Sequence, residues 1–524
     1  MPGMAVKEAR PAATWRSHQH WPVLVGLLVL AGALRLPGLA RDGMWSDECA
    51  TATWAALPYR EVVAAAAADN HAPLFFLLEK LPISALGQTE FAARLLPALL
   101  GLVAVVAVFL LGRPSHTPGI GLLAAFLLAI SPMHVHYSRE ARDYALLMVL
   151  VVLAFAAAEA VCRRGTRQDV AVLAFVLALA LYTHATAPFY LFGVLAACML
   201  PVPDRRTMRR LALACALAFA AWLPWLPVLA AQGGRAGTAY GWNQQEWQRC
   251  FPWQVPRSLA ALTHGSLAPV RNSVPDLLPS AWVGLFLVVL LVAGALRARQ
   301  GDGMTGLLVL RPLVACVVPL IAVFAVSCLG PPIYVVGRTE APVLPLFMLL
   351  VAQAAAAFPL RWRFLLPVAF AGLALLPLQA VLRLDVRSQE KLISRLLAQQ
   401  RSSSEVVVST SFLPCLQLYG GLRPGQDLLA FPQRPTLTAE WIDWRAHPRE
   451  RLPGEAAVLA ERVRATSAAR GAARVWVLHQ RDAAGAALTG AFDAAFTPAG
   501  MIDLRYLGST LTCYRVLTPS AATR

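Results

Sequence analysis

Residues 131–162 read SPMHVHYSREARDYALLMVLVVLAFAAAEAVC, a cluster of polar and charged side chains followed at once by an apolar run. The run at 144–162 is long enough to cross the hydrocarbon core of a bilayer as a helix. Further apolar runs occur at 22–40, 94–111, 119–133, 170–184, 186–200, 211–231, 279–296, 313–329, 341–359 and 364–382. The pattern predicts a polytopic α-helical membrane protein with about eleven spans.

The composition of the 524-residue chain also indicates a membrane protein. Its residues are 58% hydrophobic and only 14% charged, whereas soluble domains carry about 25% charged residues. The excess of 46 Lys and Arg over 29 Asp and Glu gives a net charge of +17, which in a soluble chain would indicate nucleic-acid binding. Here the basic residues lie in short clusters between the apolar runs, so membrane topology explains them and no nucleic-acid partner is expected.

The loops between the predicted spans alternate in charge. The first segment and every second loop after it are basic, whereas the other loops hold acidic residues such as Asp47, Glu48 and Glu140. Because cytoplasmic loops are enriched in Lys and Arg, we expect the N-terminus, residues 1–21, in the cytoplasm and the C-terminus outside a bacterial-type plasma membrane. The expected external loops are 41–93, 134–143 and 232–278.

Two stretches need a separate interpretation. Residues 73–87 are too short and too polar to span comfortably, so we expect a helix that lies on or dips into the outer face. The apolar stretch 170–200 contains the polar segment YTH at 182–184 and then Pro188. These residues predict a tight turn between two spans.

The sequence changes character at about residue 383. Two short valine-rich runs predict buried strands, and two further segments predict helices. The strands are expected at 406–408 and 475–478, and the helices at 388–400 and 454–465. About 140 residues suffice for one small domain, so we expect a transmembrane domain at 22–382 and an extracytoplasmic α/β domain at 383–524.

The first external loop holds an adjacent acidic pair, Asp47 and Glu48. Acidic residues beside a membrane surface can supply a general base, or help to bind a metal ion or a sugar hydroxyl. The alternative is that the pair only caps the following helix, because a helix N-terminus favours negative charge.

The second external loop crowds charged side chains between two spans. They are Arg139, Glu140, Arg142 and Asp143. Ionisable groups at the edge of a membrane are costly unless they are functional or paired, so they indicate either part of an active site or a structural ion-pair cluster. His134 and His136 are candidate metal ligands in the same loop, although no third ligand stands at helical spacing.

Two arginines lie where predicted spans reach the outer face. Arg35 is near the end of the first span, and Arg338 lies between the runs at 313–329 and 341–359. A guanidinium in such a place can bind a phosphate bidentately, or simply anchor the end of a helix. The chain has no GxGxxG, P-loop, HExxH or GxSxG motif, so nucleotide-driven transport and the common hydrolase chemistries have no support.

Nine cysteines without a CxxC pair exclude a disulfide scaffold and a zinc-finger array. Four of them fall on the predicted outer side: Cys49, Cys250, Cys415 and Cys513. An oxidising compartment permits disulfides there, and Cys415 with Cys513 is the best candidate pair because both flank predicted strands of one domain. The alternative is four reduced, buried thiols.

In this order, the motifs resemble those of the GT-C superfamily of integral-membrane glycosyltransferases, in the branch of the protein O-mannosyltransferases and lipid A aminoarabinose transferases. The motifs are RLP at 35–37, SDE at 46–48, HAPLFFLLE at 71–79, EFAARLLPAL at 90–99, YSREARDYAL at 137–146, YTH at 182–184 and WLPWLP at 222–227. The resemblance covers roughly residues 20–380. The chain departs from the family at Ala72, where a proline is usual, and at Thr339-Glu340, where an aromatic residue and a leucine are common.

The resemblance implies a GT-C fold and an inverting transfer of one monosaccharide from a polyprenyl-phosphate carrier to an acceptor hydroxyl of a lipid, glycan or protein, on the outer face. It implies that an acidic residue of the first external loop acts as the base. The candidate residues are Asp47 and Glu48 for catalysis; Glu140, Asp143, Arg139 and Arg142 for an acidic or donor site in the second loop; Arg338 and Arg35 for the carrier phosphate; and His71, Tyr137 and His184 for the donor or acceptor pocket. A divalent cation remains open as a cofactor.

The residues themselves support the same function. Displacement at an anomeric carbon needs a base for the acceptor hydroxyl and positive charge for the departing phosphate, and a phosphate leaving group does not need the paired carboxylates of glycoside hydrolases. A transporter or flippase of lipid-linked sugars is the alternative, but transporters usually carry polar residues at the membrane midplane. The span interiors here are almost free of charge, which favours the transferase. A scaffold with a degenerate enzyme fold is a third interpretation.

Overall fold

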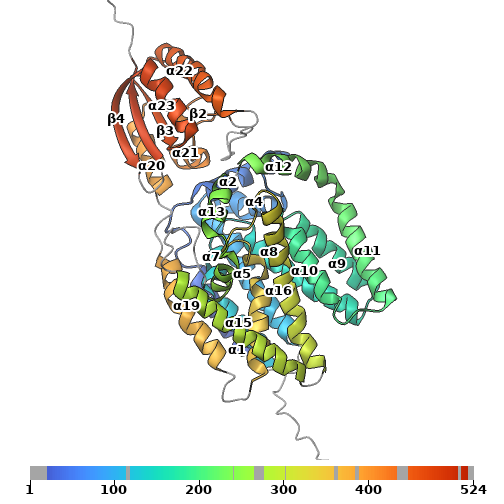
Figure 1. Ribbon diagram of the computed structural model, residues 1–524. Coiled ribbons are helices and arrows are strands. Elements are labelled where there is room, and N and C mark those ends of the chain that lie inside the picture. Colours follow the sequence, from blue (N-terminus) through green and yellow to red (C-terminus); the bar gives the residue numbers. More distant parts are fainter. Residues whose placement is uncertain are drawn as a thin grey trace, which may run out of the picture.

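The computed structural model describes residues 20–113, 118–239, 241–264, 277–300, 303–358, 364–383, 389–433, 447–504 and 509–516. It consists of a helical body and a small α/β unit at one end of that body (Figure 1). All but two residues of the predicted cytoplasmic N-terminus, 1–21, lie outside the described residues, as does 265–276 of the predicted loop 232–278.

The helical body is built almost entirely from α-helices. They are α1 (His20–Arg35), α2 (Ser46–Ala56), α3 (Tyr59–Ala68), α4 (Leu74–Leu86), α5 (Glu90–Gly112), α6 (Pro118–Ile130), α7 (Pro132–Tyr137), α8 (Tyr144–Arg163), α9 (Arg167–Leu181), α10 (Ala187–Cys198), α11 (Arg205–Trp222), α12 (Leu226–Ala239), α13 (Gly241–Cys250), α14 (Gln254–His264), α15 (Leu277–Gln300), α16 (Gly303–Leu329), α17 (Leu344–Ala356) and α19 (Leu365–Arg383). Two short 3₁₀ helices, η1 (Leu223–Trp225) and η3 (Ala341–Val343), precede α12 and α17.

Each apolar run in the sequence coincides with a helix of this body. Among the described residues, four helices are long and apolar enough to cross a membrane, at Glu90–Gly112, Tyr144–Arg163, Arg205–Gly233 and Gly306–Leu329, and shorter apolar helical stretches include His20–Arg35, Ala187–Cys198 and Leu287–Leu296. The helical, membrane-type character of the chain is therefore confirmed, while eleven spans stay a prediction. The turn expected at 182–184 is present, because α9 ends at Leu181 and α10 begins at Ala187.

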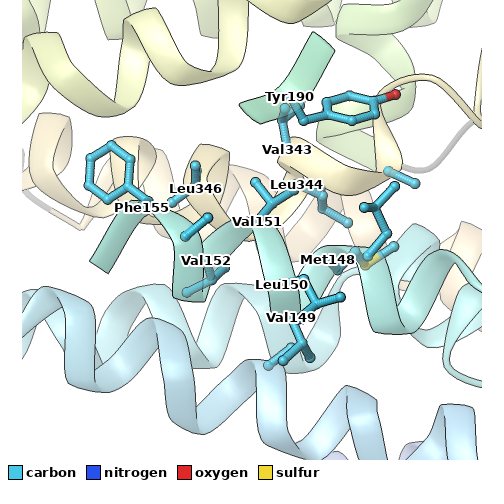
Figure 2. Packing of buried hydrophobic residues seen from close by; sticks show 14 of the residues in the cluster. Met148, Val149, Leu150, Val151, Val152, Phe155, Tyr190, Val343, Leu344 and Leu346 are labelled. Atoms are coloured by element: carbon cyan, nitrogen blue, oxygen red, sulfur yellow. The ribbon is translucent and has the colours of Figure 1, made fainter. Parts of the chain in front are cut away.

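The core of the body surrounds α8, most of whose side chains are buried, as expected for a helix that is apolar around nearly its whole circumference. Figure 2 shows Val151 of this helix beside Leu344 at the start of α17, with Tyr190 of α10 near Val343 beyond them. This packing fixes α8 in the centre of the body. The polar residues just before it are therefore held on a rigid support.

The α/β unit contains a five-stranded sheet in the order β2-β1-β3-β5-β4. Its strands are β1 (Val406–Ser409), β2 (Leu428–Ala430), β3 (Arg474–Gln480), β4 (Thr497–Leu504) and β5 (Ser509–Arg515), and its helices are α20 (Gln389–Gln400), α21 (Leu413–Gly420), α22 (Leu452–Ala469) and α23 (Ala483–Ala495). Strand β1 is parallel to β2 and β3, whereas β5 is antiparallel to β3 and β4. One face of the sheet packs on α22 and α23, and the other packs on α20 and α21. The strands and helices expected from the sequence are present, and the boundaries 22–382 and 383–524 remain predictions.

The α/β unit contacts the helical body through α21, which packs on α2. The Tyr419 hydroxyl accepts a hydrogen bond from the backbone N–H of Met44 at 2.7 Å and donates one to the Glu90 carboxylate at 2.9 Å. Lys391 of α20 forms an ion pair with the same carboxylate. Residues of the helical body and of the α/β unit together thus hold α2 in place.

The candidate disulfide between Cys415 and Cys513 is contradicted by this arrangement. Cys415 faces α2, where its sulfur lies 3.1 Å from the sulfur of Cys49. Cys513 lies on β5 opposite Trp476 and packs against the core beneath α21. Helix α21 therefore separates the two sulfurs: Cys415 is on its α2 side and Cys513 is on its sheet side. The positions of the predicted strands in the sequence could not reveal this.

Candidate active site

Three segments that are far apart in the sequence meet at the start of α8. The first is the beginning of α2, the second is α7 with the residues up to Asp143, and the third is the loop before η3. The Tyr137 hydroxyl donates a hydrogen bond to the carbonyl oxygen of Gly337, which joins the second segment to the third. Arg142 lies 3.6 Å from the Asp47 carboxylate, which joins the second to the first.

Asp47 is the partly exposed acid at the centre of this meeting point. Its side chain is in the first turn of α2 and retains 28% of its exposure. Burial lowers the pKa values of Arg142 and Arg338. Nearby negative charge, including that of Asp47, more than compensates and raises the pKa of both guanidiniums above the ordinary value. Such a carboxylate can accept a proton from a hydroxyl beside groups that stabilise an anion.

Glu48 has a different environment from Asp47, although it is the next residue. It is fully buried, and its two oxygens accept hydrogen bonds from Arg94 at 2.9 and 2.7 Å. It also accepts a hydrogen bond from the backbone N–H of Ala141 at 3.0 Å and one from Trp45 at 3.4 Å. The carboxylate therefore joins α2, α5 and the second loop, and the capping alternative applies to Glu48.

Arg338 extends from the loop before η3 toward the start of α2. Its guanidinium lies 6.0 Å from the centre of the Trp45 ring, within the range of a cation–π contact. The loop is folded by Glu340, whose carboxylate accepts hydrogen bonds from the backbone N–H of Gly337 at 2.6 Å and from the Ser258 hydroxyl. Burial raises the pKa of Glu340 to about 7, although these hydrogen bonds oppose the increase.

Histidine and acidic side chains surround Arg142. The His71 ring nitrogen lies 3.4 Å from the guanidinium, and burial followed by the charge of Arg142 lowers the His71 pKa well below its ordinary value. The buried Asp143 carboxylate has no hydrogen-bond partner among the described side chains. The His184 ring stands beside Tyr144, with ring centres 5.7 Å apart, and accepts a hydrogen bond from the Thr186 N–H at 3.1 Å.

Arg35 and Arg139 both bind carbonyl oxygens near the ends of other helices. Arg35 is completely buried and donates to the carbonyl oxygens of Leu128 and Ala129 at the end of α6 and to His134. Arg139 donates to carbonyl oxygens at the end of α1. Both guanidiniums bind carbonyl oxygens at helix ends, which agrees with the anchoring alternative for Arg35, and their assignments to the carrier phosphate and the donor site stay predictions.

The remaining candidates mainly shape the loops. Glu140 is buried and lies 3.3 Å from His136, while His134 binds Arg35, so the two histidines face different partners. Within the described ranges, no group of three or more His, Cys, Asp and Glu side chains is arranged to hold a metal ion. Tyr137 binds the Gly337 carbonyl and packs on Tyr144, so it supports the loop that carries Arg338.

Sequence reasoning assigned no role to Arg94 and Glu340, which organise these loops. Arg94 belongs to a quoted motif, and its guanidinium also binds the carbonyl oxygens of Leu39, Asp42 and Gly43 at 2.8 to 3.0 Å. The only signal for it in the sequence was an arginine at the start of an apolar helix.

Comparisons with known proteins agree with this architecture. Residues 70–230 match the family model described as dolichyl-phosphate-mannose-protein mannosyltransferase, and no curated protein matches the chain. The structure of ArnT from Cupriavidus metallidurans bound to undecaprenyl phosphate is 13% identical, covers 97% of this chain and 100% of its own, and has a TM-score of 0.50. The archaeal oligosaccharyltransferase AglB from Archaeoglobus fulgidus, in complex with an inhibitory peptide and a dolichol-phosphate, is 12% identical, covers 96% and 75%, and has a TM-score of 0.55.

The solved structures establish a shared fold, and the family model adds a sequence match that includes His71 and the whole second loop. Together they confirm the resemblance of this chain to the GT-C superfamily of membrane glycosyltransferases.

Proposed function

We propose that this protein transfers a monosaccharide from a polyprenyl-phosphate carrier to an acceptor hydroxyl at the outer face of the membrane, with inversion. The observation that carries the proposal is the meeting of Asp47, Arg142 and Arg338, from three distant segments, at one end of α8. The similar structures of ArnT and AglB hold undecaprenyl phosphate and a dolichol-phosphate, which supports a lipid-phosphate donor here.

Asp47 is assigned as the general base. It takes the proton of the acceptor hydroxyl as the oxygen attacks the anomeric carbon, and the bond from that carbon to the carrier phosphate breaks on the opposite side. The bonding electrons leave with the phosphate, so one direct displacement inverts the anomeric configuration. The Arg142 guanidinium lies 3.6 Å from the Asp47 carboxylate and orients it toward the acceptor.

Arg338 is assigned to the carrier phosphate. The phosphate gains charge as the sugar departs, and a guanidinium can bind two of its oxygens at once. The Trp45 ring supports the guanidinium from one side. Asp143, His71 and His184 are left to orient sugar hydroxyls, since the neutral imidazole of His71 and the carboxylate of Asp143 can both accept hydrogen bonds.

Glu48 and Glu140 are assigned to positioning. The Glu48 carboxylate is occupied by Arg94, and Glu140 is paired with His136. A flippase, the alternative function, would need polar groups along its path. Among the described spans, the central helix α8 carries one charged side chain between Ala145 and Val161, Glu159, which is paired with Arg311 near the predicted cytoplasmic end. The rest of this stretch is apolar, which favours the transferase.

The test is a transfer assay with the purified full chain in liposomes. Polyprenyl-phosphate sugars are supplied as donors, together with an extract of envelope lipids, glycans and proteins as the source of the acceptor hydroxyl. Released polyprenyl phosphate is measured with the wild type, Asp47→Asn and the control Glu61→Gln, which alters an exposed acid of α3. We expect release with wild type and the control only. Near-full release by Asp47→Asn would move the base to Glu140 or Asp143. Mass spectrometry of envelope glycans and lipids with and without the protein identifies the sugar and the acceptor.

The orientation has its own test. Ser402 is exposed in the α/β unit, and Val202 is exposed in the predicted cytoplasmic loop before α11. In intact cells, a membrane-impermeant maleimide should label Ser402→Cys above the parent and leave Val202→Cys unchanged until the membrane is permeabilised. The reverse pattern contradicts the proposed location of the C-terminus.

A further inference from the structure

Two buried cysteines meet where the α/β unit packs on the helical body. Cys49 lies on α2, two residues after Asp47, and Cys415 lies on α21. Their sulfur atoms are 3.1 Å apart although the residues are separated by 366 positions in the chain, and neither side chain is exposed. Small apolar residues such as Ala52 and Ala55 surround them.

We propose that Cys49 and Cys415 form a disulfide bond that links α2 to the C-terminal α/β unit. The proposal rests on the outer-face location given under the proposed function, because an oxidising compartment allows such a bond to persist. Both thiols are oxidised, a sulfur–sulfur bond replaces two S–H bonds, and two protons and two electrons pass to the disulfide of an extracytoplasmic thiol–disulfide oxidoreductase, which becomes a dithiol.

The neighbouring contacts hold the two sulfurs opposite each other without help from the bond. Tyr419, one turn after Cys415, binds Met44 and Glu90, and Lys391 binds Glu90 as well. Helices α2 and α21 are thereby aligned before oxidation, so closure needs little movement of the backbone. The cross-link then restrains the helix that carries Asp47.

The chain contains a matched control for proximity. The thiols of Cys162, at the end of α8, and Cys198, at the end of α10, are joined by a hydrogen bond. Both lie beside basic loops that are predicted to be cytoplasmic. Both pairs therefore bring two thiols into contact, but in opposite predicted compartments, and a reducing cytosol keeps the second pair as thiols.

Differential alkylation of the full chain tests the proposal. Membranes are denatured without reductant in the presence of light N-ethylmaleimide, then reduced and treated with heavy N-ethylmaleimide, and cysteine peptides are quantified by mass spectrometry. Cys49 and Cys415 should carry the heavy label and appear as one cross-linked peptide before reduction. Cys162, Cys198 and Cys513 should carry the light label.

The outcomes are separate from those of the transfer assay, because labelling does not need activity. Light label on Cys49 and Cys415 overturns the disulfide whatever the protein transfers. Heavy label on Cys162 and Cys198 alone overturns both the disulfide and the orientation. As a second measurement, Cys49→Ser and Cys415→Ser should each abolish the shift in gel mobility on reduction, whereas Cys513→Ser should retain it; a shift that survives in Cys49→Ser also overturns the proposal.

Discussion

Asp47 and Glu48 are consecutive residues of α2, and each faces an arginine in a very different way. Around Glu48 the pair is closed: both carboxylate oxygens lie within 2.9 Å of the Arg94 guanidinium, and neither side chain is accessible. Around Asp47 the pair is open, with 3.6 Å to Arg142 and over a quarter of the side chain exposed. A closed buried pair fixes structure, whereas an open pair leaves a carboxylate that a substrate can reach.

Asp47→Asn is the change that tests the open pair and has the largest expected effect. Removing a general base should lower transfer by roughly 10²–10⁴-fold, while the melting temperature stays close to that of the wild type because the side chain is partly exposed and nearly isosteric. Single-turnover rates with a lipid-linked sugar measure the loss, and Glu61→Gln should stay near wild type. A large fall in melting temperature would show that the open pair is structural too.

Glu48→Gln tests the closed pair. It leaves the buried Arg94 charge without its partner, which typically destabilises a protein by about 3–5 kcal/mol. We expect a lower melting temperature and a lower yield of folded protein, with the activity of the folded fraction reduced less than in Asp47→Asn. If Glu48→Gln instead loses transfer as strongly as Asp47→Asn and melts like the wild type, Glu48 has a catalytic role and the comparison fails.

The sequence predicted the elements of the fold far better than the side-chain partners. Apolar runs mark helices, and alternating or valine-rich runs mark strands, because burial follows from local residue types, as in β1 and β3. Arg35 and Arg338 looked alike in the sequence, since both stand at the ends of spans. Only the tertiary structure separates them, because the carbonyl oxygens that Arg35 binds belong to α6.

The same limit applies to the acidic pair and to the cysteines. Nothing local distinguishes Asp47 from Glu48, and the difference arises because Arg94 enters from α5. Cys415 was assigned to Cys513 on the assumption that a domain pairs its own cysteines. The contact of α21 with α2 across the chain is a long-range event that no short pattern encodes.

Arg338→Lys sharpens the open side of the comparison. The substitution retains the charge and loses the planar fork that binds two phosphate oxygens. Loss of about one charge-assisted hydrogen bond should raise the apparent KM for the lipid-linked donor roughly tenfold, with the KM for the acceptor little changed. Steady-state kinetics measure both constants, and Arg60→Lys, at an exposed position of α3, is the control. An equal rise in both KM values would exclude a specific role at the carrier phosphate.

Glu340 gives the smallest expected effect and a pH dependence. Burial raises its pKa from 4.5 to about 7, so the folded protein binds this proton more tightly than the unfolded chain. The resulting stability is complete below about pH 4.5 and is lost as the pH rises through about 7. The neighbouring Tyr334 does not titrate in this range, because burial raises its pKa well above the ordinary value.

The melting temperature of the wild type should therefore fall between about pH 5.5 and 8 by a few degrees more than that of Glu340→Gln, which resembles the protonated acid at every pH. The difference between the two profiles isolates this group, since the other titrating side chains are common to both proteins. The Gly337 N–H donates to the Glu340 carboxylate, and an ionised carboxylate accepts this hydrogen bond at least as well as the protonated acid, so the donor KM of the wild type should change little over the same interval. Parallel melting profiles would mean that the Glu340 proton has the same affinity in the folded and unfolded chains.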